Sequence, residues 1–147
     1  MGVEIAHDKF VNHMPLDRQS QDMKSSGLMV SPKTLFGITE HLHNLVEEIP
    51  AMIREEILSQ KWAHIDESPM KFFNPKKASG FVWSLSNNFG AYYQFEPSRS
   101  GAVAKEMLKG FKGTVISDAH KGYDWLDDPK QTDMGHAYCW NKVRSYL

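Results

Sequence analysis

A change of hydrophobic period near residue 61 constrains the fold of this chain more than any other feature of its sequence. Before it, apolar residues recur at steps of mostly three and four, as on one face of an amphipathic helix; they are Leu35, Ile38, Leu42, Leu45, Ile49, Met52 and Ile57. Ser31 and Pro32 are suited to be the N-cap and the first residue of that helix. Because proline interrupts helices, Pro50 predicts a kink or two abutting helices.

After residue 61 the pattern is typical of strands. Three short segments, 62–68, 80–86 and 91–95, are rich in aromatic and β-branched residues. Between the last two, Asn87, Asn88 and Gly90 supply the residues of a turn. The sequence therefore predicts a three-stranded antiparallel meander.

A helix and a fourth strand are expected after the meander. Ser100 is suited to cap a helix that ends at Gly110 and Gly113, and residues 114–118 have the composition of a strand. Another helix is expected from about Lys121. A strand–helix–strand unit after a meander predicts an α/β fold, a mixed sheet with helices packed against it. We therefore expect a helical segment over residues 1–60 and a sheet core over residues 61–147.

Length and composition exclude several classes of protein. The 147 residues suit one compact domain, and no run approaches the roughly 18 apolar residues of a membrane span. The first residues lack the basic and apolar regions of a secretory signal, so we expect a cytoplasmic protein without a membrane partner. The single cysteine, Cys139, excludes an internal disulfide, and with His136 it makes only a weak zinc site.

The formal net charge of -1 conceals an uneven distribution of charge along the chain. Residues 1–70 carry 6 basic and 11 acidic side chains, whereas residues 71–121 carry 8 basic and 3 acidic ones. Basic side chains interleaved with aromatic ones can neutralise phosphates and stack on bases. The segment is therefore a candidate DNA surface, with a solvated strand face as the simpler interpretation. Its candidate contacts are Lys76, Lys77, Arg99, Lys109, Lys112 and Lys121.

Two aspartates stand out on this framework: Asp66 lies within the first predicted strand and Asp118 at the end of the fourth. If these strands are neighbours, the two carboxylates converge, and their repulsion favours a divalent cation between them. Oxygen ligands suit Mg²⁺ or Mn²⁺, and pairs of such ions are a common device of phosphodiester chemistry. The structural alternative is that each aspartate accepts hydrogen bonds from the backbone or from Lys121 at a strand end.

Other polar residues are weaker candidates for this site. His64 alternates onto the same face as Asp66, although a packed or surface histidine is the simpler interpretation. Glu67 should point to the opposite face of the strand, so we do not expect it in the site. The sequence contains no Gly-rich phosphate loop, nucleophile elbow or zincin motif.

Five short motifs follow one another along the second half of the chain: HIDESP at 64–69, GFVW at 80–83, SRS at 98–100, GFKG at 110–113 and DAHKGY at 118–123. In order and spacing they resemble the core of insertion-sequence-sixty-six (IS66) type DDE transposases. The segments 9–19 and 30–35 are similar to stretches before that core. The segment 139–144 resembles the family's Cys-Trp-x-His-x-Arg stretch, with Lys142 in place of the histidine.

The resemblance implies a ribonuclease-H-like core, in which two aspartates and a glutamate hold two Mg²⁺ (or Mn²⁺) ions for attack on a phosphodiester. It makes Asp66 and Asp118 the first two catalytic, metal-binding acids, and it makes the transposon ends and target DNA the partners. The third acid of the family lies beyond the Cys-Trp stretch and has no counterpart in these 147 residues. We therefore expect a transposase fragment that leaves its metal site empty and is inactive alone, in a bacterial cell and near the nucleoid.

Two other functions stay open. One is a non-catalytic module that binds DNA, full-length transposase or another copy of itself; salt-dependent DNA binding without Mg²⁺-dependent cleavage would favour it. The other is a stand-alone ribonuclease-H-like nuclease with a substitute acid such as Asp124, Asp127 or Asp128. Metal-dependent nicking that disappears in Asp118→Asn would favour the nuclease.

Overall fold

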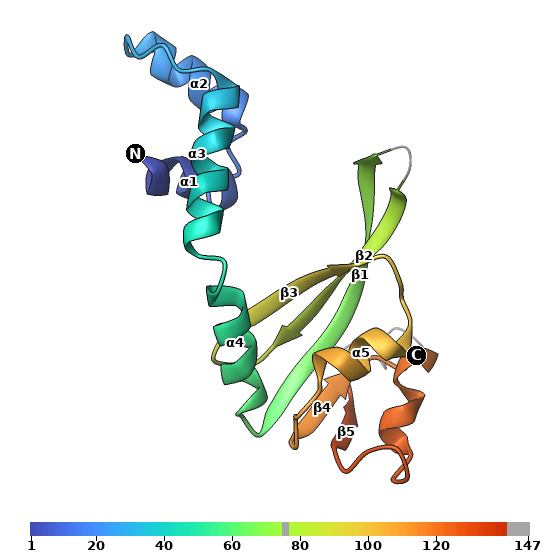
Figure 1. The fold of residues 1–147 in the computed structure, drawn as a ribbon. Coiled ribbons are helices and arrows are strands. Elements are labelled where there is room, and N and C mark those ends of the chain that lie inside the picture. The colour runs from blue at the N-terminus through green and yellow to red at the C-terminus, as the bar shows by residue number, and fades with distance from the viewer. Residues whose placement is uncertain (75–76, 141–147) are drawn as a thin grey trace. The chain divides into compact units, whose positions relative to one another are not determined.

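The structure is a computed structural model that describes residues 1–74 and 77–140 (Figure 1). Within that part of the chain it contains five α-helices, one 3-10 helix and five strands. The chain divides into two units, Met1–Ile49, which is helical, and Pro50–Leu147, which holds the sheet.

The helical unit consists of α1 (Gly2–Phe10), α2 (Leu16–Ser25) and α3 (Pro32–Leu45). The hydrophobic pattern did not predict α1 and α2, which each bury one residue, Ile5 and Gln19. The side-chain amide of Gln19 donates to the carbonyl oxygens of Ile5, at 3.2 Å, and Met14, at 3.1 Å. A buried amide group therefore joins α2 to α1. An apolar stripe, which the sequence pattern could have revealed, is not what makes this contact.

The predicted start of α3 is confirmed. Ser31 is the N-cap and its side-chain oxygen accepts the backbone N–H of Thr34 at 3.1 Å, with Pro32 as the first helical residue. The predicted division is also confirmed, because α3 ends at Leu45 and a separate helix, α4 (Ile49–Leu58), follows. Pro50 therefore lies in the first turn of α4, where its missing N–H costs no helical hydrogen bond.

The second unit is built on a mixed five-stranded sheet with the strand order β3-β2-β1-β4-β5. The strands are β1 (Trp62–Asn74), β2 (Lys77–Ser86), β3 (Ala91–Glu96), β4 (Thr114–Ser117) and β5 (Gly135–Tyr138). β1 pairs with β2, and β2 with β3, in antiparallel orientation, so the predicted meander is confirmed. β4 lies parallel to both β1 and β5. β5 was not predicted, because its segment Gly-His-Ala-Tyr has no β-branched residue, whereas β4, of the same length, has three.

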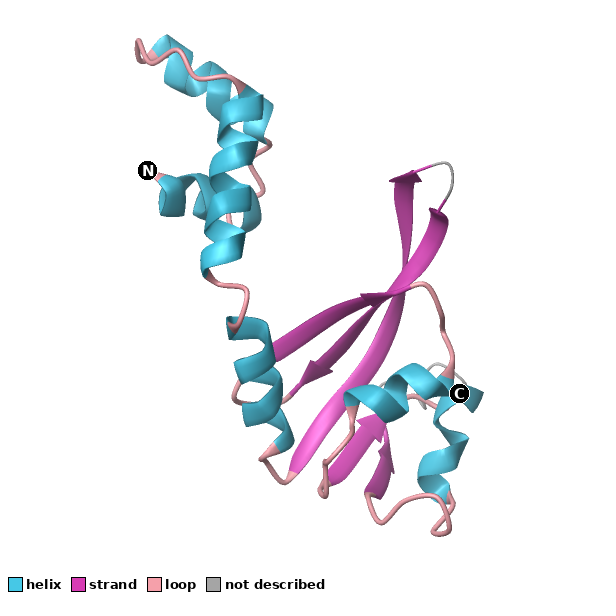
Figure 2. Ribbon diagram, in the orientation of Figure 1, coloured by secondary structure: helices cyan, strands magenta, loops and turns pink. Residues whose placement is uncertain are grey.

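Three helices cover one face of this sheet: α4, α5 (Gly101–Met107) and the 3-10 helix η1 (Lys121–Asp127), which lies where a further helix was expected (Figure 2). Their buried residues form one cluster with the strands; it consists of Ile57, Ala63, Ile65, Trp83, Leu85, Ala104, Met107, Leu108, Phe111, Val115, Tyr123 and Leu126. The predicted α/β mixed sheet with packed helices is therefore confirmed.

Alternation along β1 separates the two faces. Ala63, Ile65 and Glu67 are buried under the helices, whereas His64 and Asp66 point to the other face and are exposed. In the described residues no helix is long and apolar enough to cross a membrane.

Candidate functional site

Asp66 and Asp118 line a single cavity of about 420 Å³. Their strands, β1 and β4, are parallel neighbours whose last aligned pair is His64 with Ile116. Each aspartate lies two residues beyond its member of that pair, so both reach the same end of the sheet. The structure thus places both aspartates, which the sequence expects to converge if their strands are neighbours, in the lining of one cavity.

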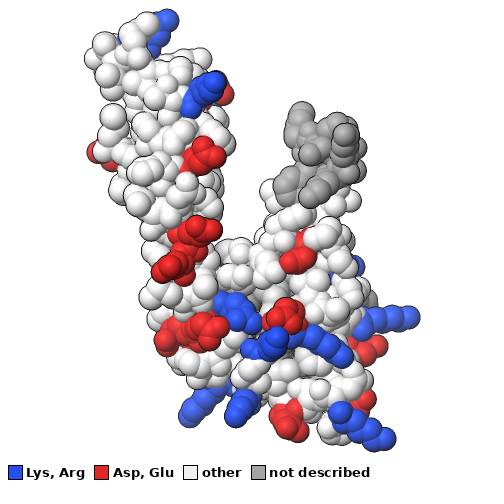
Figure 3. All heavy atoms as spheres, in the orientation of Figure 1, with Lys and Arg blue, Asp and Glu red and all other residues white. Residues whose placement is uncertain are grey.

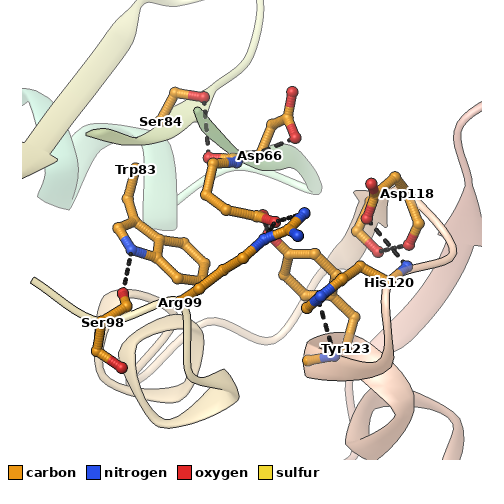
Figure 4. Close-up of polar contacts among 11 residues, drawn as sticks. Asp66, Trp83, Ser84, Ser98, Arg99, Asp118, His120 and Tyr123 are labelled. Atoms are coloured by element: carbon orange, nitrogen blue, oxygen red, sulfur yellow. Dashed lines mark hydrogen bonds and ion pairs between the residues drawn. The ribbon is translucent and has the colours of Figure 1, made fainter. Parts of the chain in front are cut away.

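Both carboxylates are held by the backbone beside them. Asp66 Oδ1 accepts the N–H of Glu67 at 3.0 Å, and Asp118 Oδ1 accepts the N–H of His120 at 3.0 Å (Figure 4). His120 in turn caps η1, because its Nδ1 accepts the N–H of Gly122 at 3.0 Å. The structural alternative, backbone hydrogen bonds to each aspartate, is therefore also realised, and it does not compete with a role in the cavity.

The rest of the cavity lining is both polar and apolar, and among the described residues it includes no Lys or Arg. It consists of His64, Ile65, Ser84, Ser86, Ile116, Ser117 and Cys139. Among the residues that the structure describes, no group of three or more His, Cys, Asp or Glu side chains could hold a metal ion. Asp66 and Asp118 are the two carboxylates of the lining, and within the described residues His136 and Cys139 belong to no such group.

Glu67 lies on the opposite face from Asp66, as alternation predicts, but its side chain is only 1% exposed. Its Oε1 accepts Nε–H and Nη2–H of Arg99, each at 2.7 Å, and its Oε2 accepts the hydroxyl of Tyr123 at 2.5 Å (Figure 4). Arg99, a candidate DNA contact from the sequence, is thus paired with a buried carboxylate.

The buried carboxylate belongs to a larger network around Tyr123. Burial, and then the hydrogen bond to Glu67, raises the pKa of Tyr123 above its ordinary value, so this hydroxyl stays a donor. The rings of Trp83 and Tyr123 meet edge to face at 6.3 Å, and Trp83 Nε1 donates to the carbonyl of Ser98 at 3.1 Å. Sequence reasoning missed this network. One sequence signal could have revealed the network: alternation places Glu67 on the same face of β1 as Ala63 and Ile65. If that face is buried, the charge of Glu67 needs a partner.

The other candidate DNA contacts that the structure describes are exposed lysines. Lys109 lies 3.5 Å from Glu106 in an exposed pair, and Lys112 and Lys121 are exposed. Lys76 lies outside the described residues, as does the side chain of Lys77. On the face drawn in Figure 3, the basic side chains of the sheet unit alternate with acidic ones.

A second polar cluster lies at the end of η1. Asp127 Oδ1 lies 2.8 Å from Nδ1 of His136, and its Oδ2 accepts the hydroxyl of Tyr138 at 2.5 Å. Nε2 of His136 lies 2.9 Å from Oγ of Ser117. The bond from Tyr138, followed by that to His136, lowers the pKa of Asp127. Similarly, the bond from the Gln131 side chain lowers the pKa of Asp128. Neither aspartate is among the residues that line the cavity.

Comparison with known proteins gives one family. The family model described as Transposase IS66 family matches residues 1–147, the whole chain. A curated relative, Uncharacterized protein y4hP of Sinorhizobium fredii (strain NBRC 101917 / NGR234), is 25% identical, and the match covers 82% of this chain but 24% of that protein. The chain therefore spans about a quarter of the length of this relative. No solved structure matches the chain.

Proposed function

The chain belongs to the IS66 transposase family, and on that premise we propose that its sheet unit supplies two metal-binding carboxylates, Asp66 and Asp118, to a DDE-type catalytic core. The observation that carries the proposal is that both side chains line one cavity at the end of two neighbouring parallel strands. The strand order, an antiparallel meander followed by two parallel strands, is compatible with the ribonuclease-H-like core that we propose for this unit.

The donor chemistry of the cavity suits Mg²⁺ or Mn²⁺. Asp66 and Asp118 offer carboxylate oxygens, and Ser84 and Ser86 belong to the same lining. Hard divalent cations prefer such oxygen ligands. Among the described residues, no Lys or Arg side chain lines the cavity.

In the proposed reaction, Asp66 and Asp118 bind and orient the cation. The backbone N–H groups of Glu67 and His120 keep one oxygen of each carboxylate in place. A divalent cation held by Asp66 and Asp118 would supply Lewis-acid chemistry, lowering the pKa of a water or DNA 3′-hydroxyl and stabilising charge on the attacked phosphate.

We further propose that Asp66 and Asp118 alone do not support DNA cleavage. The described residues bring two carboxylates to the cavity and no third metal-ligating group close enough to them. A third ligand has to come from outside the described residues before two cations can be held side by side. We propose that DNA cleavage and strand transfer belong to the whole transposase. We also propose that its DNA partners are the transposon ends and the target.

Mn²⁺ binding to the 147-residue chain tests the site directly. We expect weak binding, seen as loss of the free-ion signal in electron paramagnetic resonance, that Asp66→Asn and Asp118→Asn each weaken at least about tenfold. Asp22→Asn is the matched control, because Asp22 is an exposed carboxylate of α2 far along the chain from both acids. Binding that is equal in all four proteins would refute the assignment.

A non-catalytic DNA-binding role is the second candidate, and the exposed Lys112 and Lys121 of the sheet unit favour it. Charge reversal of both should weaken DNA binding and reduce its salt dependence, by about one released counterion for each phosphate that is no longer neutralised. Lys33→Glu, in α3, is the control. Mg²⁺-dependent nicking by the chain alone would instead indicate the stand-alone nuclease, and Asp127→Asn would then test its substitute acid.

A further inference from the structure

We propose that Tyr123, through its hydrogen bond to the buried Glu67, is a positioning residue that fixes the Asp66 and Asp118 carboxylates relative to one another. The inference rests on the proposed function of the two aspartates as metal ligands. It concerns residues on the covered face of the sheet, which do not line the cavity.

Four hydrogen bonds, connected through the covalent structure of Glu67, Tyr123 and His120, join the two acids. The N–H of Glu67 donates to Asp66 Oδ1 at 3.0 Å, and the Glu67 side chain accepts the Tyr123 hydroxyl at 2.5 Å. The N–H of Tyr123 donates to the carbonyl of His120 at 2.9 Å, and the N–H of His120 donates to Asp118 Oδ1 at 3.0 Å. Each end of the path is therefore a carboxylate oxygen of one proposed ligand.

The middle of this path is rigid because it is buried and packed. Tyr123 is 1% exposed, and its ring meets those of Trp83 and His120 edge to face, each at 6.3 Å. Arg99 holds the other oxygen of the Glu67 carboxylate with two N–H groups. η1 comes after Asp118 in the chain, and β1 carries Asp66. A displacement of η1 therefore has to move β1 with it.

Stability alone does not account for a buried charge at position 67. Buried ion pairs replaced by apolar residues of similar volume often leave a protein as stable or more so. Glu67 shares its face of β1 with Ala63 and Ile65, so an apolar residue there would continue the core. What an apolar residue cannot do is accept the Tyr123 hydroxyl, and that bond is the step that connects β1 to the turn after Asp118.

Tyr123→Phe removes only the hydroxyl, and Tyr138→Phe is a matched control. Both hydroxyls donate to a carboxylate at 2.5 Å, but Tyr138 is exposed and its partner, Asp127, does not line the cavity. We expect Tyr123→Phe to weaken Mn²⁺ binding about tenfold, as loss of an outer-shell partner does at metal sites, and Tyr138→Phe to leave it unchanged. Glu67→Gln, which keeps an acceptor for Tyr123, should bind Mn²⁺ like the parent, whereas Glu67→Leu should behave like Tyr123→Phe.

Amide hydrogen exchange of the metal-free chain provides an independent readout. The two amides to follow are those of Glu67 and His120, because each donates to one of the acids. In Tyr123→Phe both should exchange at least about tenfold faster at a temperature where the variant is fully folded, since exchange reports local opening. A purely structural effect would speed exchange throughout the core rather than at these two amides first.

The outcomes separate the two proposals. If the parent binds Mn²⁺ through Asp66 and Asp118 but Tyr123→Phe binds it equally well, the positioning role is wrong and the metal site stands. If the parent binds no Mn²⁺, the metal site is wrong, and the amide exchange still decides whether Tyr123 holds the two carboxylates. Unchanged exchange at both amides in Tyr123→Phe would overturn the inference whichever way the metal behaves.

Discussion

Replacing Arg99 by methionine should destabilise the sheet unit strongly, because it removes the charged partner of a buried carboxylate. Arg99 is 44% exposed, but the Glu67 side chain that it pairs with is 1% exposed. Removing one partner of a buried ion pair costs about 3–5 kcal/mol, because the remaining charge is left without compensation. Tyr123 still donates to Glu67 in the variant, so we expect the lower part of that range, about 3 kcal/mol.

Thermal unfolding measures the cost. For a unit of the size of Pro50–Leu147, each kcal/mol lowers Tm by about 4–8 °C, so Arg99→Met should lower it by more than about 10 °C. Lys109→Met is the control: Lys109 and its partner Glu106 are each 74% exposed, and exposed pairs contribute about 0–1 kcal/mol.

The double variant Glu67→Gln/Arg99→Met tests the reason for the loss. It removes the buried charge together with its partner and keeps an acceptor for Tyr123, so most of the lost stability should return. Two results would refute the reasoning. One is a Tm of Arg99→Met within a few degrees of the parent's. The other is a double variant no more stable than Arg99→Met, which would show that the uncompensated carboxylate is not the cause.

Four further predictions rest on local geometry and charge. Gly113→Ala should destabilise the sheet unit by about 1–3 kcal/mol in thermal unfolding, because its new Cβ would meet the backbone carbonyl just before β1. Gly37→Ala, with nothing within 4 Å in α3, should instead stabilise its helix by about 0.5–1 kcal/mol. The Asp127 carboxyl, whose pKa is lowered in the fold by Tyr138 and then by His136, contributes stability above about pH 4 that is lost as pH falls through its folded value. Tyr138→Phe should raise that pKa towards the ordinary value in a carboxyl NMR titration. The pKa of Tyr123 is raised in the fold, chiefly by burial, so its contribution is complete below about pH 10 and is lost as pH rises further. Unfolding followed against pH should therefore show a steeper alkaline loss in the parent than in Tyr123→Phe.

The sequence predicts those parts of the fold in which hydrophobic residues recur regularly or a turn or cap residue marks the boundary. The meander, the cap of α3 at Ser31 and the strand before Asp118 all have signals within a few residues. The sequence left open whether β4 lies beside β1, because the helix α5 connects β4 to β3 and the rule for such connections does not name the neighbouring strand. The structure supplies that pairing, and with it the common cavity of Asp66 and Asp118.

The parts that the sequence did not predict have weak local signals. α2 buries Gln19 rather than an apolar stripe, so its hydrophobic pattern resembles that of a polar loop. β5 has four residues and, unlike the equally short β4, no β-branched residue to mark it as a strand. The partners of Glu67 lie 32 and 56 residues further along the chain, at Arg99 and Tyr123. Alternation could place Glu67 on the covered face, but only the tertiary structure shows what compensates its charge.

The adjacent acids Asp66 and Glu67 also bear on how β1 finds its register. A slip of one residue would turn every side chain of the strand to the other face. Asp66 would then be buried under the helices, with a side chain one methylene shorter and therefore less able to reach Arg99, while Ala63 and Ile65 would turn away from the core. An uncompensated buried carboxylate and the lost apolar burial would each cost several kcal/mol. In the shifted register, Glu67 rather than Asp66 would face the cavity, and the ion pair between Glu67 and Arg99 would be lost. That ion pair therefore favours the native register of β1.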